Sequence, residues 1–383
     1  MRFLFVVSDY DTGGITASLK NLTTLLADRG HEVELLDLPK LGRLPDGFDN
    51  RIKIVPLEKR SVLWNLSVED IKRSGFFGKI KYSVLGFFKK IMNRSEAWMN
   101  YAFKNLKFEG YDAVIGFRQS PVCFYLASRK SVGAKKIGFW HGDVDYMGDI
   151  SSWDYYLSEL DSVACVSNAT RDSMMNRYPQ LCTKPCTVYN TFNECEIKRL
   201  ADSDVIYNKE DFNIVTVARI EFDQKQLQFV PEICRRLKNE GVFVKWHIVG
   251  DGPHRKELER LIEQNGVEEM VILHGTQSNP FVYIKNADLF VLTSIWETYG
   301  MVIVESLICG TPVVAGHYPA LPEILSDGEN GLIAENSVDG IYDMVKRAIT
   351  DKELYKKIKL GVEKFQYSPL VAYEQFMEMM ENA

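Results

Sequence analysis

Residues 294–314, SIWETYGMVIVESLICGTPVV, predict the end of a strand, a loop, a helix, a tight turn and a second strand. Gly300 allows the backbone to approach a ligand closely, and a helix beginning near Met301 directs its free N–H groups and its positive dipole end at that loop. An anion such as a diphosphate would be bound there. Glu297 lies before the helix and Glu305 within it, so the two carboxylates can accept hydroxyl hydrogen bonds from different parts of one long ligand.

Alternating elements extend from this stretch in both directions. Short apolar runs rich in Val, Ile and Phe alternate with longer amphipathic stretches, which is typical of βαβ units around a parallel sheet. The expected strands are 3–7, 32–36, 113–117, 136–140, 162–166 and 186–189 in the N-terminal half, and 213–217, 244–249, 271–274, 289–292, 312–315 and 331–334 in the C-terminal half. The fold class is therefore α/β with two parallel sheets.

The chain is long enough for two domains, because 383 residues exceed what one ordinary core organises. The polar stretch 193–211 separates the two sets of strands. We place the N-terminal domain at 1–200 and the C-terminal domain at 205–368. The final helix, within 369–383, is a candidate to fold back onto the N-terminal domain.

Composition excludes several classes of protein. A hydrophobic content of 46% with 26% charged residues indicates a folded globular chain, and a net charge of −6 gives no general attraction to nucleic acid. The opening apolar run is too short for a signal peptide, and no apolar stretch approaches the roughly 20 residues that cross a bilayer. We therefore expect a cytoplasmic protein. Its seven cysteines should be reduced, and the group Cys182, Cys186 and Cys195 lacks a paired CxxC and a nearby His, so no metal is expected.

The C-terminal half offers further groups at the ends of its strands. Arg219 at a strand end and Lys225 in the following loop are two cations that suit a leaving diphosphate. Gly250 in HIVGDGP (247–253) is a glycine turn, and Gly275 with Thr276 follows the next strand. Such turns occur at the carboxyl edge of many doubly wound sheets, so only their order along the chain is informative.

The N-terminal half has two candidate features. Gly13 and Gly14 in DTGGI (11–15) follow the first strand and precede a helix, which gives a backbone cradle for a phosphate or an acceptor. The G-x-G-x-x-G fingerprint is absent, which argues against a nicotinamide or flavin oxidoreductase. His141 in WHGD (140–143) comes just after a strand, although a lone His is more often structural than functional.

The combination resembles glycosyltransferase family 4, whose signature has two glutamates separated by seven residues (E-x7-E) and then a Gly-Thr-Pro-Val-Val-like turn. The resemblance implies the GT-B fold, with two Rossmann-like domains facing across a cleft, and a retaining reaction without metal or cofactor. It assigns Glu297 to the donor sugar and Glu305 to the nucleotide ribose, and it places the backbone of Tyr299 to Met301 at the donor phosphates. Thr298 is a further donor-binding candidate.

The resemblance covers the other motifs as well. It places Arg219 and Lys225 on the diphosphate, the turn at Gly250 beside the nucleotide, and the stretch from His274 to Thr276 at the base. His141 would lie beside the transferred sugar. One departure is that the family's lysine is usually followed by glycine, where this chain has Gln226.

These features predict a hexosyltransferase that uses a nucleoside diphosphate sugar, by resemblance a UDP-sugar, and a glycan or lipid-linked saccharide acceptor in surface polysaccharide or glycolipid synthesis. Two alternatives are a nucleotide-sugar epimerase of similar two-domain shape and a binding module without catalysis.

Residues 72–94 carry seven basic and no acidic side chains in an amphipathic pattern. This pattern favours an interfacial helix on an anionic inner membrane face, the alternative being a surface helix packed on its own domain.

Overall fold

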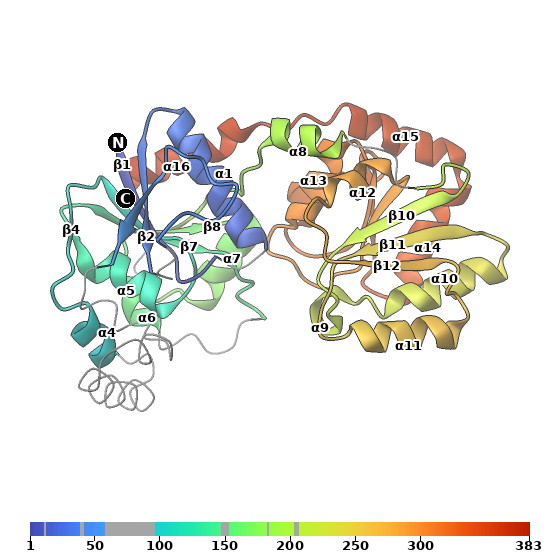
Figure 1. Cartoon of the computed structure of the whole chain (residues 1–383), viewed down its shortest axis with the longest axis horizontal. Helices are drawn as coiled ribbons and strands as arrows, with labels where there is room; N and C mark the ends of the chain where they lie inside the picture. The colour runs from blue at the N-terminus through green and yellow to red at the C-terminus, as the bar shows by residue number, and fades with distance from the viewer. Residues whose placement is uncertain (11–12, 39–41, 58–95, 147–152, 182–183, 203–206) are drawn as a thin grey trace. The chain divides into compact units, whose positions relative to one another are not determined.

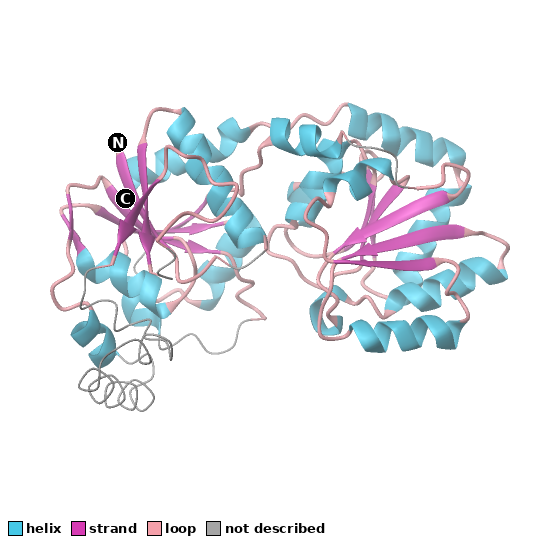
Figure 2. Ribbon diagram, in the orientation of Figure 1, coloured by secondary structure: helices cyan, strands magenta, loops and turns pink. Residues whose placement is uncertain are grey.

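A computed structural model describes residues 1–10, 13–38, 42–57, 96–146, 153–181, 184–202 and 207–383. The chain divides into two compact units, of which unit 1 comprises residues 1–191 with 369–383 and unit 2 comprises residues 192–368. Each unit is built on one main parallel sheet with helices on its faces (Figures 1 and 2). The basic segment 72–94 lies outside the described residues.

Unit 1 has a seven-stranded sheet in the order β3-β2-β1-β5-β7-β8-β9, and every neighbouring pair is parallel. Its strands are β1 (Arg2–Val6), β2 (Glu32–Asp37), β3 (Lys53–Pro56), β5 (Ala113–Gly116), β7 (Lys135–Trp140), β8 (Ser162–Cys165) and β9 (Lys184–Thr187), with a separate pair, β4 (Phe108–Glu109) and β6 (Ser131–Val132). Its helices are α1 (Gly14–Asp28), α4 (Glu96–Ala102), α5 (Pro121–Lys130), α6 (Asp154–Ser158), α7 (Asn168–Arg177) and α16 (Pro369–Asn382).

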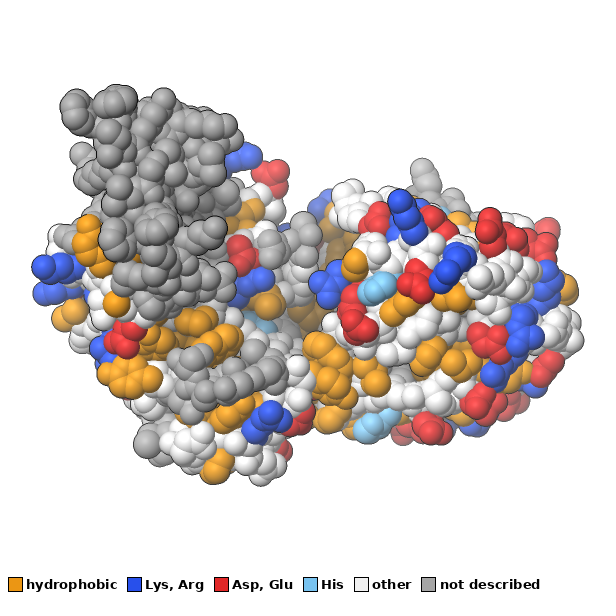
Figure 3. Space-filling model, turned by 90° about the horizontal axis from the view of Figure 1, so that it is seen from below, with side chains coloured by type: hydrophobic (Ala, Val, Ile, Leu, Met, Phe, Trp, Pro, Cys, Tyr) orange, Lys and Arg blue, Asp and Glu red, His pale blue; other side chains and the backbone are white. Residues whose placement is uncertain are grey.

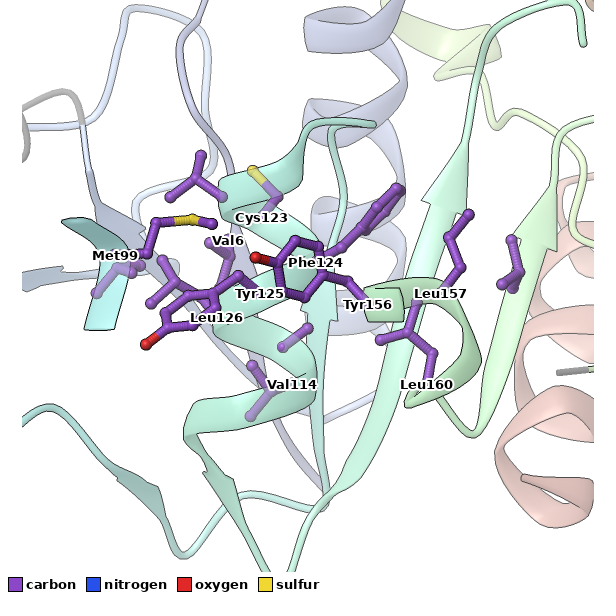
Figure 4. Close-up of a cluster of buried hydrophobic side chains, with 14 of the residues drawn as sticks. Val6, Met99, Val114, Cys123, Phe124, Tyr125, Leu126, Tyr156, Leu157 and Leu160 are labelled. Atoms are coloured by element: carbon purple, nitrogen blue, oxygen red, sulfur yellow. The ribbon is translucent and has the colours of Figure 1, made fainter. Parts of the chain in front are cut away.

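The central strand β1 explains why both faces of this sheet are covered. Successive side chains of a strand point to opposite faces, and here both sets are fully buried. Leu4 and Val6 join a cluster with α4, α5 and α6, part of which is shown in Figure 4, whereas Phe3 and Phe5 join a second cluster with α1 and α16. A continuous apolar run is therefore the pattern of a central parallel strand.

The last helix, α16, belongs to unit 1. Phe376, Met379 and Met380 are buried in the same cluster as Phe3, whose ring meets that of Phe376 edge-on at 5.4 Å between centroids. The Gln375 side chain also accepts a hydrogen bond from the Tyr189 N–H at 3.0 Å. The C-terminus of the chain thus completes the core that its N-terminal strand begins.

Unit 2 has a six-stranded sheet in the order β12-β11-β10-β13-β14-β15, again parallel throughout. Its strands are β10 (Phe212–Val217), β11 (Val244–Val249), β12 (Val271–Gly275), β13 (Leu289–Leu292), β14 (Val313–Gly316) and β15 (Gly331–Ala334). Its helices are α8 (Glu194–Ala201), α9 (Phe222–Lys225), α10 (Phe229–Asn239), α11 (Arg255–Asn265), α12 (Phe281–Asn286), α13 (Met301–Cys309), α14 (Val338–Thr350) and α15 (Lys352–Glu363), with a short 3-10 helix, η3 (Leu321–Glu323).

The strand order of unit 2 fixes where a ligand would bind. From β10 the chain moves outward to β11 and β12, then returns to the other side of β10 and moves outward through β13, β14 and β15. The order reverses between β10 and β13, and in open α/β sheets ligands bind at the carboxyl ends of the strands at such a switch point. The α/β class and both parallel sheets expected from the sequence are confirmed.

The division between the units falls earlier than the sequence suggested. We placed the boundary in 193–211, but α8 packs on α12 and α13 and so belongs to unit 2. The Asn279 amide donates to the Leu200 carbonyl at 2.8 Å, and Lys285 forms an ion pair with Asp202 at 2.9 Å. The polar surface of α8 concealed a helix that buries only Ile197 and Ala201.

Surface charges in unit 2 are mixed. On the face shown in Figure 3, acidic and basic side chains are interspersed over this unit. Neighbouring helix positions form ion pairs, such as Arg235 with Glu232 at 2.7 Å and Arg260 with Glu257 at 3.2 Å. Among the described residues, no helix has the length and apolar character needed to cross a membrane.

Candidate active site

Two segments meet at the switch point of unit 2. One is the short helix α9, which follows β10, and the other is the loop 293–300, which follows β13. The Ile295 N–H donates to the Gln224 carbonyl at 2.9 Å, and the Gln224 amide donates to the Trp296 carbonyl at 3.1 Å. The Thr293 hydroxyl donates to the Lys225 carbonyl at 2.5 Å. These bonds join residues about seventy positions apart in the sequence into one rigid surface.

The Glu297 carboxylate lies at the centre of this surface. Its Oε1 atom accepts from the Lys225 ammonium, and also from the Ser294 hydroxyl at 2.8 Å. Both partners of the ion pair are largely shielded, with 17% of the Lys225 side chain and 13% of the Glu297 side chain exposed. No described residue hydrogen-bonds to Oε2, so one oxygen is held in place while the other remains available to a ligand hydroxyl.

Gly300 begins α13 and has a φ of 83°, in the left-handed region that favours glycine. A Cβ atom on Gly300 would lie 2.1 Å from the Tyr318 hydroxyl oxygen. That hydroxyl is buried and donates to the Tyr299 carbonyl at 3.2 Å. Tyr318 therefore sets the path of the loop into the helix, whose first N–H groups have no partner within the helix and attract anions.

Gly300→Ala is expected to destabilise unit 2 by about 3 kcal/mol or more, because left-handed strain of about 1–2 kcal/mol adds to a clash with Tyr318. Gly310→Ala is a matched control, since Gly310 has the same φ of 83° at the other end of α13 but an open space beside it. Urea unfolding should show a loss of only about 1 kcal/mol for that control. Adding Tyr318→Phe should restore part of the Gly300→Ala loss; equal losses for the two glycine variants would contradict the clash.

Glu305 lies on α13, about one turn beyond Gly300. Its side chain is only partly accessible, and burial raises the pKa of the carboxyl to about 7. No described residue hydrogen-bonds to the Glu305 carboxyl or forms an ion pair with it. A desolvated carboxylate without partners is costly, and two ligand hydroxyls would supply the donors it lacks.

The second cation, Arg219, is arranged differently from Lys225. Its side chain is 64% exposed and lies 3.6 Å from Glu221, whose other carboxylate oxygen accepts from the Asp223 N–H at 2.8 Å at the start of α9. The structure therefore brings Lys225 to Glu297, and it gives Arg219 no hydrogen bond or ion pair with either. Arg219 is an accessible cation at the carboxyl end of β10.

Gln226, which stands where the family usually has glycine, has a backbone conformation that favours glycine. Gln226 has a φ of 51° and is the single residue other than glycine with a positive φ among those the structure describes. Glycine adopts this conformation without the penalty of about 1–2 kcal/mol that other residues incur. A glycine after the lysine would relieve strain, and the chain tolerates Gln226 because α9 ends there in any case.

The glycine turns of β11 and β12 serve close backbone crossings. A Cβ on Gly250 would lie 1.9 Å from the Ala218 carbonyl oxygen, and the Gly250 N–H donates to the Gly275 carbonyl at 2.8 Å. Gly275 has a φ of 68°, and Thr276 is exposed just beyond it. These residues shape the carboxyl edge beside β10, which accounts for the glycines without requiring that they touch a ligand.

The N-terminal candidates lie in unit 1. Gly13 has an extended backbone with open space around it, and Gly14 starts α1. His141 is 8% exposed, and its Nε2 atom donates to the Phe117 carbonyl at 2.9 Å. Burial lowers the pKa of this imidazole to about 4, so it is neutral at pH 7 and cannot act there as a cation.

Several neighbours of these groups were missed by the sequence analysis. The Gln119 side-chain oxygen accepts from the His141 N–H at 2.7 Å and from the Gly142 N–H, which fixes the loop after β7. Ser294 and Tyr318 each lie within three residues of the end of a predicted strand. That position was the only signal in the sequence that could have identified them.

Within the described part of the chain, no three His, Cys, Asp or Glu side chains gather as a metal site would require. The reaction without a metal therefore stays a prediction.

Parts of the chain are similar to known proteins. Residues 200–364 match the family model described as "Glycosyl transferases group 1". The chain is 25% identical over 251 residues to N-acetyl-alpha-D-glucosaminyl L-malate synthase of Bacillus anthracis, across 62% of this chain and 64% of that protein. It is 30% identical over 179 residues to N-acetylgalactosamine-N,N'-diacetylbacillosaminyl-diphospho-undecaprenol 4-alpha-N-acetylgalactosaminyltransferase of Campylobacter jejuni, across 46% of this chain and 47% of that one. The chain thus spans less than two thirds of these relatives.

Solved structures show the fold. HepE from Anabaena in complex with UDP and glucose superposes with a TM-score of 0.64 at 16% identity, covering 100% of both chains. Together with the two parallel sheets, this likeness identifies the fold as GT-B.

Proposed function

Because residues 200–364 match the group 1 glycosyltransferases, we propose that the chain is a retaining glycosyltransferase of family 4 type that uses a nucleoside diphosphate sugar. The observation that carries the proposal is the Lys225–Glu297 pair beside the start of α13, where a cation, a free carboxylate oxygen and helix N–H groups converge. This set matches a ligand with a diphosphate next to a polyhydroxylated ring.

The family resemblance suggests a role for each residue, and the contacts of Lys225 and Glu297 support theirs. The free Oε2 of Glu297 accepts from a donor sugar hydroxyl and orients the ring. Lys225, Arg219 and the first N–H groups of α13 stabilise the charge that develops on the departing diphosphate, as a metal would elsewhere. Glu305 receives the ribose hydroxyls. We assign no nucleophile to the chain, and the configuration at the sugar is retained by attack of the acceptor on the face that the diphosphate leaves.

The acceptor is proposed to be a glycan or a lipid-linked saccharide. One relative, from Campylobacter jejuni, is named for a diphospho-undecaprenol substrate, which supports a lipid-linked class. Neutral His141 would meet the transferred sugar as a hydrogen-bonding group.

Residues 72–94 would hold the protein on an anionic inner membrane face. Flotation with anionic liposomes should show binding that weakens when Lys79, Lys89 and Lys90 are replaced with Glu. Unchanged flotation would contradict this role.

A panel of nucleoside diphosphate sugars tests the function. We expect UDP-sugars to raise the Tm and to be hydrolysed slowly, because HepE, which shares the fold, was solved with UDP and glucose. Product analysis with and without a saccharide acceptor separates the alternatives. An epimerase would convert the donor without acceptor, and a binding module would shift the Tm without turnover; either result would overturn the transferase.

A further inference from the structure

A chain of three polar side chains crosses the sheet of unit 2, from Asn213 near the amino end of β10, through His247 in β11, to His274 near the carboxyl end of β12. Asn213 Oδ1 lies 3.1 Å from His247 Nε2, and His247 Nδ1 lies 2.9 Å from His274 Nε2. Asn213 and His247 are 2% and 6% exposed. His247 is on the face of β11 opposite Trp246 and Ile248, which face the hydrophobic core.

The orientation of the Asn213 amide is fixed by its neighbours. Its Nδ2 atom donates to two backbone carbonyls, those of Asn208 and Asp211, each at 2.9 Å. Both amide protons are therefore used, and Oδ1 must face His247 as an acceptor. Such an assignment rests on the hydrogen-bond network, and here backbone carbonyls leave one solution.

The tautomers of both histidines follow from this orientation. Since Asn213 Oδ1 can only accept, His247 Nε2 carries the proton and His247 Nδ1 is the acceptor. His274 Nε2 must then carry a proton and donate to His247. Burial lowers the pKa of both imidazoles, that of His247 to about 4, so neither ring takes a second proton at neutral pH.

Aromatic rings hold the array in position. Tyr207 stacks on His247 with 4.0 Å between ring centroids, and its hydroxyl donates to the Tyr283 carbonyl at 3.1 Å. The Tyr283 ring in turn meets His274 at 4.8 Å, edge to face. The two imidazoles therefore have little freedom to rotate.

The result is an unprotonated nitrogen, Nδ1 of His274, at the carboxyl edge of the sheet. No described residue hydrogen-bonds to it, and it is not among the buried polar atoms left without a partner. Gly275 follows at once. β12 is two strands from β10, or about 10 Å, which is within the reach of a nucleoside whose diphosphate lies at the switch point.

We propose that His274 Nδ1 accepts a hydrogen bond from a ring N–H of the donor base, and that Asn213 and His247 are positioning residues that keep this nitrogen an acceptor. The inference rests on the proposed function and deepens it. Uracil has a ring N–H that can donate to His274 Nδ1. Cytosine has an unprotonated ring nitrogen at the same position, so two hydrogen-bond acceptors would face each other. The site is thereby selective for a UDP-sugar over a CDP-sugar.

Two substitutions at one position separate this role from a structural one. His274→Gln places an amide near the former Nε2, where it can still donate to His247, but removes the Nδ1 acceptor. His274→Asn places an amide oxygen near the former Nδ1. In calorimetric titrations we expect the unmodified chain to bind UDP at least about 10-fold more tightly than CDP, His274→Gln to fall to about threefold or less, and His274→Asn to keep most of the preference.

Imidazole 15N spectra report on the positioning residues directly. His274 should show the Nε2–H tautomer in the empty protein, with its Nδ1 signal shifting when UDP is added. His247→Gln should mix the tautomers of His274. A His274→Gln chain that still prefers UDP as strongly as the unmodified chain would overturn the inference and leave the transferase intact, whereas no binding of any nucleoside diphosphate by the unmodified chain would overturn both.

Discussion

Replacing Glu297 with Gln or Ala is expected to lower kcat for sugar transfer by about 100-fold or more while the chain stays folded. A hydrogen bond to a charged group contributes about 1.5–3 kcal/mol, which corresponds to about 10-fold to 150-fold in rate if it is made in the transition state. Glu297 adds a second effect, because its loss leaves the shielded Lys225 ammonium without its partner. Steady-state turnover of a UDP-sugar with acceptor is the measurement.

Ser294→Ala is the matched control for Glu297. It removes the 2.8 Å hydrogen bond to the same Oε1 atom but leaves the carboxylate and Lys225 in place. We expect a loss of about 10-fold or less, because the carboxylate that binds the sugar and its ion pair with Lys225 both remain. Thermal unfolding of each variant distinguishes a chemical loss from a folding defect, and turnover of Glu297→Ala at the unmodified rate would refute the site proposed here.

Replacing Glu305 with Gln should move stability and nucleotide binding in opposite directions. The carboxyl pKa is raised to about 7 in the folded chain from an ordinary value of 4.5, so the folded state retains a proton that the unfolded state releases. Below pH 4.5 the Glu305 carboxyl is protonated in both states, so burial of an ionised carboxylate does not lower the free energy of unfolding. The penalty grows between pH 4.5 and 7 and is complete above pH 7.

The Gln variant removes that penalty. The empty variant should therefore be more stable than the unmodified chain at pH 8, by at most about 3 kcal/mol, and nearly equal to it at pH 5. Nucleotide affinity should show the reverse, because ribose hydroxyls donate to the ionised carboxylate. UDP binding to the unmodified chain should strengthen as pH rises through 7, and the variant should bind weakly at every pH. A variant that binds UDP with unchanged affinity and pH profile would remove Glu305 from the site.

Much of the fold follows from local pattern. The six strands expected in unit 2 all occur within a residue or two of their expected ends, because continuous apolar runs mark buried parallel strands. The strand β3 was missed, since Lys53 and Pro56 interrupt its apolar character. It lies at the edge of its sheet, where one side of a strand needs no partner and such residues are tolerated.

The site was predicted by residue but not by arrangement. Lys225 and Glu297 were both singled out, yet their ion pair joins residues 72 positions apart and depends on the strand order of the sheet. The same holds for Asn213, His247 and His274, which meet only because β10, β11 and β12 are neighbours. Periodicity locates a strand, whereas cross-strand partners follow from topology, which no local pattern encodes.

The return of α16 to unit 1 means that, in topological terms, unit 2 is an insertion into unit 1. During synthesis the residues of unit 2 are all present before Phe376 emerges from the ribosome, and Phe376 is part of the core around β1. Unit 1 is therefore the first unit to be started by the ribosome and the last to be completed. The half of the chain that is made first must wait, with the part of one sheet face beside α1 still uncovered, until α16 is made.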